Sequence, residues 1–254
     1  MGVVNVTPDS FSDGGQFSGA SEAIKYARDL VRQGADVIDV GGESSRPGAQ
    51  PVSEADELAR VLPVIEALAG EVRISIDTAK PAVARAAIAA GATLVNDITA
   101  NLHGVAADHG VGWVAMHMQG GPRTMQVEPR YRDVVAEVTE FLVARAAAAR
   151  ADGVQEIWID PGIGFGKTVA HNWALLAAIP RLAATGWPVT VGTSRKAFLG
   201  RAAADADGTD TPTPASDRLE GSVATAWRAA ADGAAMVRVH DVAATVAAFQ
   251  AAAA

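Results

Sequence analysis

Hydrogen-bonding and charged side chains follow the short apolar runs of this sequence, each at the end of its run. Asp77 and Asn96 end two successive runs, ISID and LVN. A carboxylate beside a carboxamide offers complementary donors and acceptors to a flat, amide-like heterocycle, although either residue could instead cap a following helix. Asp160 ends another run and adds a second carboxylate. Together the three side chains predict a site for a nitrogen-rich ring.

A second group of residues is mostly basic and suits an anionic ligand. Lys196, Arg238 and His240 follow the last two runs, Arg46 follows the second, and Asn5 ends the first. Arginine presents a two-pronged donor to phosphate oxygens, and lysine presents a point charge. Each could be a solvated surface residue, but their shared position in a chain of net charge −8 favours an anion site. A helix beginning close to Lys196 would add backbone N–H groups.

The segment DPGIGFGK at 160–167 looks like a phosphate-binding loop, but its spacing is wrong for one. A Walker A loop needs glycine where Pro161 stands, and the dinucleotide fingerprint needs G-x-G-x-x-G rather than G-x-G-x-G. One remaining interpretation is a tight glycine turn into a helix. The other, which we favour, is a ligand-binding Asp160 whose crowded backbone surroundings require small residues.

Composition and the remaining motifs exclude several classes of protein. Cysteine is absent, so disulfides, cysteine-ligated metals and thiol nucleophiles are excluded. The five histidines lack zinc-site spacing, and the serines lack a G-x-S-x-G elbow. Two carboxylates could serve glycoside hydrolysis, but the surrounding Asn, Lys, Arg and His fit that poorly. The acidic balance argues against nucleic acid, and no apolar run approaches the ~18 residues that span a bilayer. No secretory signal is visible, so we expect a cytoplasmic protein without a membrane partner.

Eight β-branched runs alternate with helical stretches and must position these residues. Continuous apolar runs are typical of parallel strands buried on both faces, in an open doubly wound sheet or a closed barrel. A barrel brings all eight strand ends to one face, and the count and the length of 254 residues favour it. We predict one α/β domain over 1–254, a (β/α)8 TIM barrel. The predicted strands are 3–6, 37–40, 72–76, 94–96, 113–116, 157–159, 189–191 and 236–239. The predicted helices lie within 21–33, 53–69, 80–90, 103–109, 131–151, 170–184, 217–231 and 241–252.

Three predicted loops are longer than the usual connection from strand to helix. Residues 7–20 and 41–52 form long loops after the first and second strands, and residues 120–130 form the third. Long loops at this face are candidate lids over a substrate. Residues 205–216 are predicted to be a connecting insertion only.

The sequence closely resembles the dihydropteroate synthase family of bacterial folate biosynthesis. The resemblance covers nearly the whole chain and rests on eight segments in order, each of which would be weak alone. They are NVTPDSFSDGG at 5–15, GGESSRPGA at 41–49, SIDT at 75–78, VNDI at 95–98, MHMQG at 116–120, DPGIGFGK at 160–167, SRK at 194–196 and VRVHD at 237–241.

The resemblance implies a (β/α)8 barrel that joins 6-hydroxymethyl-7,8-dihydropterin diphosphate to 4-aminobenzoate and releases pyrophosphate with Mg²⁺ present. It also implies a homodimer. The catalytic residues it implies are Asp77, Lys196, Arg238 and His240. The pterin site would comprise Asp77, Asn96, Met116, Asp160, Phe165, Gly192 and Lys196. The diphosphate would be held by Asn5, Ser45, Arg46, Arg238 and His240, with Asn5 also on the metal. The aminobenzoate would meet Phe11, Pro47, Lys196 and Ala197.

Two departures from the family pattern are mild. Ser45 stands where threonine is common, and Ala197 stands where some relatives carry a hydroxyl. Two alternatives remain open: a pterin-dependent methyltransferase, which shares the barrel and the ring-holding Asp and Asn, and a pterin-binding paralogue without catalysis. The segments GESSR and SRK and the pair Arg238 and His240 argue against the methyltransferase. The retained loop and diphosphate residues argue against the paralogue.

Overall fold

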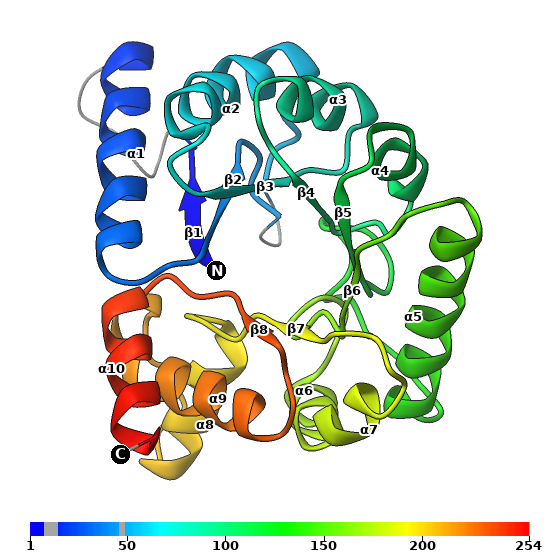
Figure 1. Cartoon of the computed structure of the whole chain (residues 1–254). Helices are drawn as coiled ribbons and strands as arrows, with labels where there is room; N and C mark the ends of the chain where they lie inside the picture. Colours follow the sequence, from blue (N-terminus) through cyan, green and yellow to red (C-terminus); the bar gives the residue numbers. More distant parts are fainter. Residues whose placement is uncertain (8–14, 46–48, 254) are drawn as a thin grey trace.

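Eight parallel strands form a closed ring in the computed structural model, which describes residues 1–7, 15–45 and 49–253. Strands β1 to β6 pair in sequence order, and β7 pairs with β8. Parallel bridges between Ile159 and Val189, and between Gly2 and Val239, join these two parts. Figure 1 shows the ring surrounded by helices, so the predicted barrel is confirmed. The strands are β1 (Gly2–Asn5), β2 (Val37–Gly41), β3 (Arg73–Asp77), β4 (Leu94–Asp97), β5 (Gly112–Met116), β6 (Ile157–Asp160), β7 (Thr190–Val191) and β8 (Met236–Val237).

The helices pack outside the ring. They are α1 (Gly15–Arg32), α2 (Glu54–Leu68), α3 (Pro81–Ala89), α4 (His103–His109), α5 (Val134–Ala151), α6 (Val169–Ala177), α7 (Ile179–Ala183), α8 (Ala197–Ala206), α9 (Leu219–Ala231) and α10 (Val242–Ala253). Side-chain caps mark the start of two of them. The Ser53 hydroxyl accepts the Asp56 N–H at the start of α2, and the Asp133 carboxylate accepts two N–H groups at the start of α5.

The predicted helices differ from the observed ones in three places. Helix α1 begins at Gly15, earlier than predicted. The stretch predicted as one helix at 170–184 contains α6 and α7, because Pro180 has no N–H to continue the helical bonding. Helix α8 was absent from the predicted helices, and half of its ten residues are alanine, which weakens the apolar periodicity.

The strands separate two apolar clusters. Inside the ring, Met1, Val37, Leu94 and Val114 pack together, with Trp158 and Met236 against them. Their strand neighbours, such as Ile38, point outward and pack under the helices. The interior is therefore filled, and a substrate site has room only at an end of the ring.

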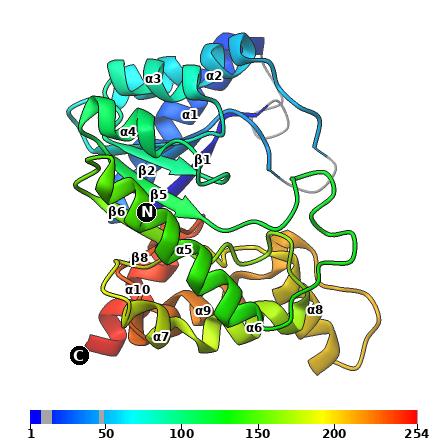
Figure 2. The same ribbon diagram turned by 90° about the vertical axis from the view of Figure 1, so that its right-hand side faces the viewer.

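The strand ends carrying the predicted site residues share one end of the barrel. Register alone aligns Asn5, Gly41, Asp77 and Asn96 across β1 to β4. Figure 2 shows the loop after β5 on the side toward which the strands point, away from the C-terminus. Among the described helices, none is both long and apolar enough to cross a bilayer.

Candidate active site

A guanidinium shared by two carboxylates lies at the carboxyl ends of β2, β3 and β8. Arg238 donates from Nε to Asp39 Oδ2 at 2.6 Å and from Nη2 to Asp77 Oδ2 at 2.8 Å. Asn96 Nδ2 donates to the same Asp39 oxygen at 3.0 Å. The structure therefore brings Asp77, Asn96 and Arg238 together, as the sequence predicted.

Burial and the neighbouring charges shift the pKa values of Asp77 and Arg238. Burial, together with the nearby charge of Asp39, raises the pKa of Asp77 to about 7, although the Arg238 cation opposes the rise. Burial acts to lower the pKa of Arg238, but Asp39 and Asp77 outweigh it and raise that pKa. Arg238 is thus a permanent cation beside a carboxyl group that titrates near neutrality.

Asp39 was not predicted, because the sequence analysis considered polar residues at the ends of apolar runs. It lies inside β2, is fully buried, and holds both Arg238 and Asn96 through one oxygen. The available signal was a carboxylate in the middle of the apolar run VIDV. Carboxylates are almost never fully buried unless they are paired, so this position indicated a buried cationic partner.

A second charged group lies at the ends of β6 and β7. Asp160 Oδ1 accepts the Gly162 N–H at 2.7 Å. Lys196 Nζ donates to the Ile163 carbonyl and lies 4.8 Å from the centroid of the Phe165 ring, a cation–π contact. Burial lowers the pKa of Lys196 to about 8, although Asp160 opposes this, and burial raises the pKa of Asp160 against the pull of Lys196.

The glycine-rich segment after β6 forms the tight turn that one interpretation predicted, in crowded backbone surroundings, whereas ligand binding by Asp160 stays a prediction. Gly162, Gly164 and Gly166 have φ of +63°, +85° and +63°, values that L side chains rarely adopt. The segment is thus a tight turn, and it also places Phe165 beside Lys196. It contains no Walker-type phosphate loop, as its spacing predicted.

Other predicted residues complete the same end of the barrel. Met116 is buried and pairs with Asp160 in register. A Cβ on Gly192 would lie 3.7 Å from Lys196 Nζ and 3.6 Å from Arg238 Cβ, so Gly192 separates these two side chains. The Ser194 hydroxyl lies 2.9 Å from His240 Nδ1 and fixes that ring beside Arg238.

The predicted loop residues are only partly described. Ser45 is half-buried, and Ala197 is exposed at the first turn of α8. Phe11, Arg46 and Pro47 lie outside the described residues, as do residues 8–14 of the predicted loop 7–20.

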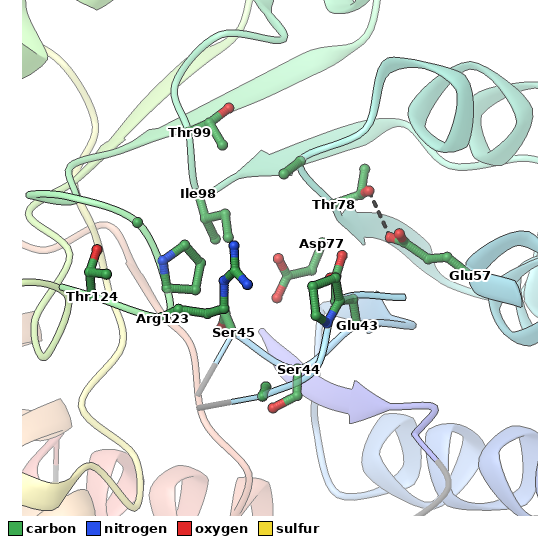
Figure 3. A pocket seen from close by; sticks show the side chains of 15 residues that line it. Glu43, Ser44, Ser45, Glu57, Asp77, Thr78, Ile98, Thr99, Arg123 and Thr124 are labelled. Carbon is green, nitrogen blue, oxygen red and sulfur yellow. Dashed lines mark hydrogen bonds between the residues drawn. The ribbon is translucent and has the colours of Figure 1, made fainter. Parts of the chain in front are cut away.

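A cavity of about 340 Å³ opens beside Asp77. Figure 3 shows Asp77, Ser45 and Ile98 around it, with Arg123 from the loop after β5 across the opening. This places part of the predicted loop 120–130 at the cavity, whereas Ile98 and Arg123 were not singled out in the sequence. On its α2 side the wall is charged: Thr78 donates to the buried Glu57 at 2.7 Å, and Lys80 contacts the carboxylates of both Glu43 and Glu57.

Within residues 1–7, 15–45 and 49–253, no group of three or more His, Cys, Asp or Glu side chains could hold a metal ion. Magnesium keeps most of its water and needs few protein oxygens. The half-buried Asn5 carboxamide, at the end of β1, fits a magnesium ion that arrives with a phosphorylated ligand.

The chain is similar over most of its length to known pterin-binding enzymes. The family model described as "Pterin binding enzyme" matches residues 1–240. The dihydropteroate synthase of Synechocystis sp. is 46% identical over 251 residues, covering 95% of this chain and 84% of the relative. The structure of Xanthomonas albilineans dihydropteroate synthase with 4-aminobenzoic acid has a TM-score of 0.90 at 46% identity, covering 100% of this chain and 92% of that one. The same enzyme in complex with 7,8-dihydropteroate has a TM-score of 0.87 at 44% identity, covering 100% and 93%.

The chain therefore belongs to the pterin-binding enzyme family. Within that family its relatives are dihydropteroate synthases, which are transferases, so the resemblance found in the sequence is confirmed.

Proposed function

We propose that this site condenses 6-hydroxymethyl-7,8-dihydropterin diphosphate with 4-aminobenzoate, giving 7,8-dihydropteroate and pyrophosphate. The observation that carries the proposal is the alternation of charge at one barrel end, where Arg238 bridges Asp39 and Asp77 and Lys196 lies beside Asp160. Such a site can hold a substrate that divides into a cation and an anion. Complexes of a related enzyme with 4-aminobenzoic acid and with 7,8-dihydropteroate support both substrate classes.

The pterin ring binds at the ends of β3, β4 and β6. Asp77, Asn96 and Asp160 form hydrogen bonds with its ring nitrogens and exocyclic groups, and Lys196 contacts its polar edge. Met116 and Phe165 supply the apolar walls, and Gly192 leaves room between Lys196 and Arg238.

The diphosphate binds beside Arg238. The Nε bond to Asp39 anchors this guanidinium, while its remaining N–H groups can turn from Asp77 to phosphate oxygens. His240, held by Ser194, adds a second donor. The other residues of this subsite are Asn5, Ser45 and Arg46. When bound, Mg²⁺ neutralises part of the diphosphate charge, and Asn5 would hold it.

The reaction proceeds by loss of diphosphate before the amine attacks. The bond between the methylene carbon and the diphosphate oxygen breaks, and its electron pair leaves with pyrophosphate, whose charge Arg238 and His240 stabilise. The electron-rich dihydropterin shares the positive charge, which Asp77 and Asp160 favour. The amine nitrogen then forms the new C–N bond and releases its proton. Phe11, Pro47, Lys196 and Ala197 position the arylamine, and the two long loops exclude water.

Two copies of the chain pair through the face formed by α9 and α10. Trp227 and Leu219 are exposed on α9, and a shallow groove lined by Trp227, Val223 and Ala248 runs between the two helices. Large exposed apolar side chains of this kind are typical of protein interfaces. Sedimentation should give a dimer that Trp227→Asp dissociates, and a monomeric wild type would contradict pairing.

Replacing Asp77 or Lys196 with alanine tests the site. Asp77→Ala and Lys196→Ala should reduce the rate of amine-dependent pyrophosphate release at least a hundredfold, because each removes a group that touches the pterin. Asp232→Ala, on the exposed C-terminal end of α9, is the matched control and should act like the wild type. An unchanged rate in either site variant would defeat the assignment.

A further inference from the structure

Lys167 is the last residue of the segment DPGIGFGK, and its side chain does not serve an anion site. It is 3% exposed. Its ammonium donates to the Phe165 carbonyl at 2.9 Å and the His117 carbonyl at 3.2 Å, and it lies 3.0 Å from His117 Nδ1. No carboxylate lies within ion-pair distance of it among the described residues, and burial lowers its pKa to about 7, although the charge of Asp160 opposes this. A buried ammonium held by neutral acceptors is costly, so packing alone does not explain its presence.

The His117 ring opposite Lys167 accepts a hydrogen bond from its ammonium. Burial and the Lys167 charge lower the pKa of His117 to about 3, so the ring is neutral near pH 7 and Nδ1 is an acceptor. The Phe141 ring packs edge-on against it, with centroids 5.0 Å apart and planes at 89°. His117 is therefore a rigid anchor on the loop after β5.

The segment that Lys167 fastens to this anchor is the one that holds Lys196. A Cβ on Gly162 would collide with the His117 carbonyl oxygen, and one on Gly166 would collide with the Gln119 carbonyl. The Tyr131 hydroxyl donates to the Gly166 carbonyl at 2.8 Å. The two backbones therefore touch, and the docked segment presents the Ile163 carbonyl and the Phe165 ring to Lys196.

We propose that Lys167 is a positioning residue: its buried ammonium clamps the 162–166 turn onto the loop after β5 and thereby sets the position of the Lys196 ammonium for the pterin substrate. The proposal concerns the turnover described above and so rests on the proposed function. The geometric part, Lys167 acting on Lys196, can be measured without turnover.

The chain has only four lysines, Lys25, Lys80, Lys167 and Lys196, so lysine labelled with ¹³C at Cε gives four NMR signals that single variants assign. We would titrate Lys196 in the wild type, in Lys167→Met and in Arg73→Met. The control removes an Arg73–Glu156 ion pair, 2.6 Å long, at the other end of the barrel. Lys196 is faced by Asp160, Asp77 and Arg238, which these variants leave in place, and by the charge of Lys167, which only Lys167→Met removes.

In Lys167→Met the loosened turn exposes Lys196 to water and the repulsion by the Lys167 charge is lost, so the pKa of Lys196 should rise from about 8 toward that of free lysine. KM for the pterin diphosphate should rise about tenfold, with a smaller change in kcat, whereas Arg73→Met should match the wild type in both. Tyr131→Phe, which also serves if Lys167→Met does not fold, loosens the same turn without removing a charge, and the proposal requires a smaller rise in the Lys196 pKa in this variant too. An unchanged Lys196 titration in the folded variant overturns the proposal. A wild type that titrates as expected but turns over no pterin diphosphate overturns the proposed function instead.

Discussion

Arg238 and Asp39 are 199 positions apart in the sequence, yet Arg238 Nε lies 2.6 Å from Asp39 Oδ2 at the end of the barrel interior. Asp39 is fully buried and also accepts from Asn96. One buried carboxylate thus orients a proposed diphosphate-binding cation and a proposed pterin-binding amide. In the proposed function, substrate recognition at this end of the barrel depends on a residue that need not touch substrate.

Asp39→Asn tests that dependence. Removing one partner of a buried ion pair costs about 3–5 kcal/mol, because the other charge stays buried. We expect such a loss in the free energy of unfolding by denaturant, and at least a tenfold fall in the rate of pyrophosphate release. Asp232→Asn, which breaks the more exposed Arg228–Asp232 pair, should change stability by less than about 1 kcal/mol. Equal behaviour of the two variants would contradict the role of Asp39.

Gly162 and Gly208 have nearly equal backbone conformations. Alanine at the two positions therefore separates the cost of backbone strain from the cost of steric crowding. Gly162 has φ +63° and Gly208 has φ +67°, so alanine at either position costs about 1–2 kcal/mol of left-handed strain. A Cβ at Gly208 meets nothing within 4 Å, whereas one at Gly162 collides with the His117 carbonyl. We expect Gly162→Ala to lose about 1–3 kcal/mol more than Gly208→Ala and to raise KM for the pterin substrate. Equal losses in thermal unfolding and an unchanged KM would show that the turn is not pressed against its neighbour.

The pH dependence of kcat/KM should be bell-shaped with a narrow maximum. Burial raises the pKa of Asp77 to about 7, so activity should rise with pH as Asp77 loses its proton. Burial lowers the pKa of Lys196 to about 8, so activity should fall above that pH as the ammonium loses its charge. Asp77→Asn should remove the acidic limb from the residual activity, and Lys196→Met should remove the alkaline limb. A flat profile between pH 6 and 9 would contradict both assignments.

Loss of diphosphate before attack predicts that, at saturation, the basicity of the amine has little influence on the rate. Across ring-substituted 4-aminobenzoates at saturation, kcat should stay nearly constant while the basicity of the amine varies, because C–O cleavage precedes C–N formation. The measurement is the initial rate of pyrophosphate release for each amine. A kcat that rises steeply with amine basicity would indicate direct displacement.

The strands and the polar residues at their carboxyl ends could be predicted from the sequence because both depend on local patterns. Continuous apolar runs mark buried parallel strands, and parallel strands of a barrel end at one face, so Asp77, Asn96 and Asp160 were expected to meet. Asp39 was not predicted because its role depends on its contact with Arg238, which is distant in the sequence. Lys167 resembled a phosphate-loop lysine, and only the fold shows that it points to His117. Helix α8 was missed because alanine supports a helix without marking a buried face.

The most direct test of the account is pyrophosphate release from 6-hydroxymethyl-7,8-dihydropterin diphosphate in Mg²⁺, measured with and without 4-aminobenzoate. The account predicts sustained release only with the amine, and one dihydropteroate formed for each pyrophosphate. Tight pterin binding with no release would contradict catalysis and indicate a pterin-binding protein. Neither binding nor release would contradict the site itself.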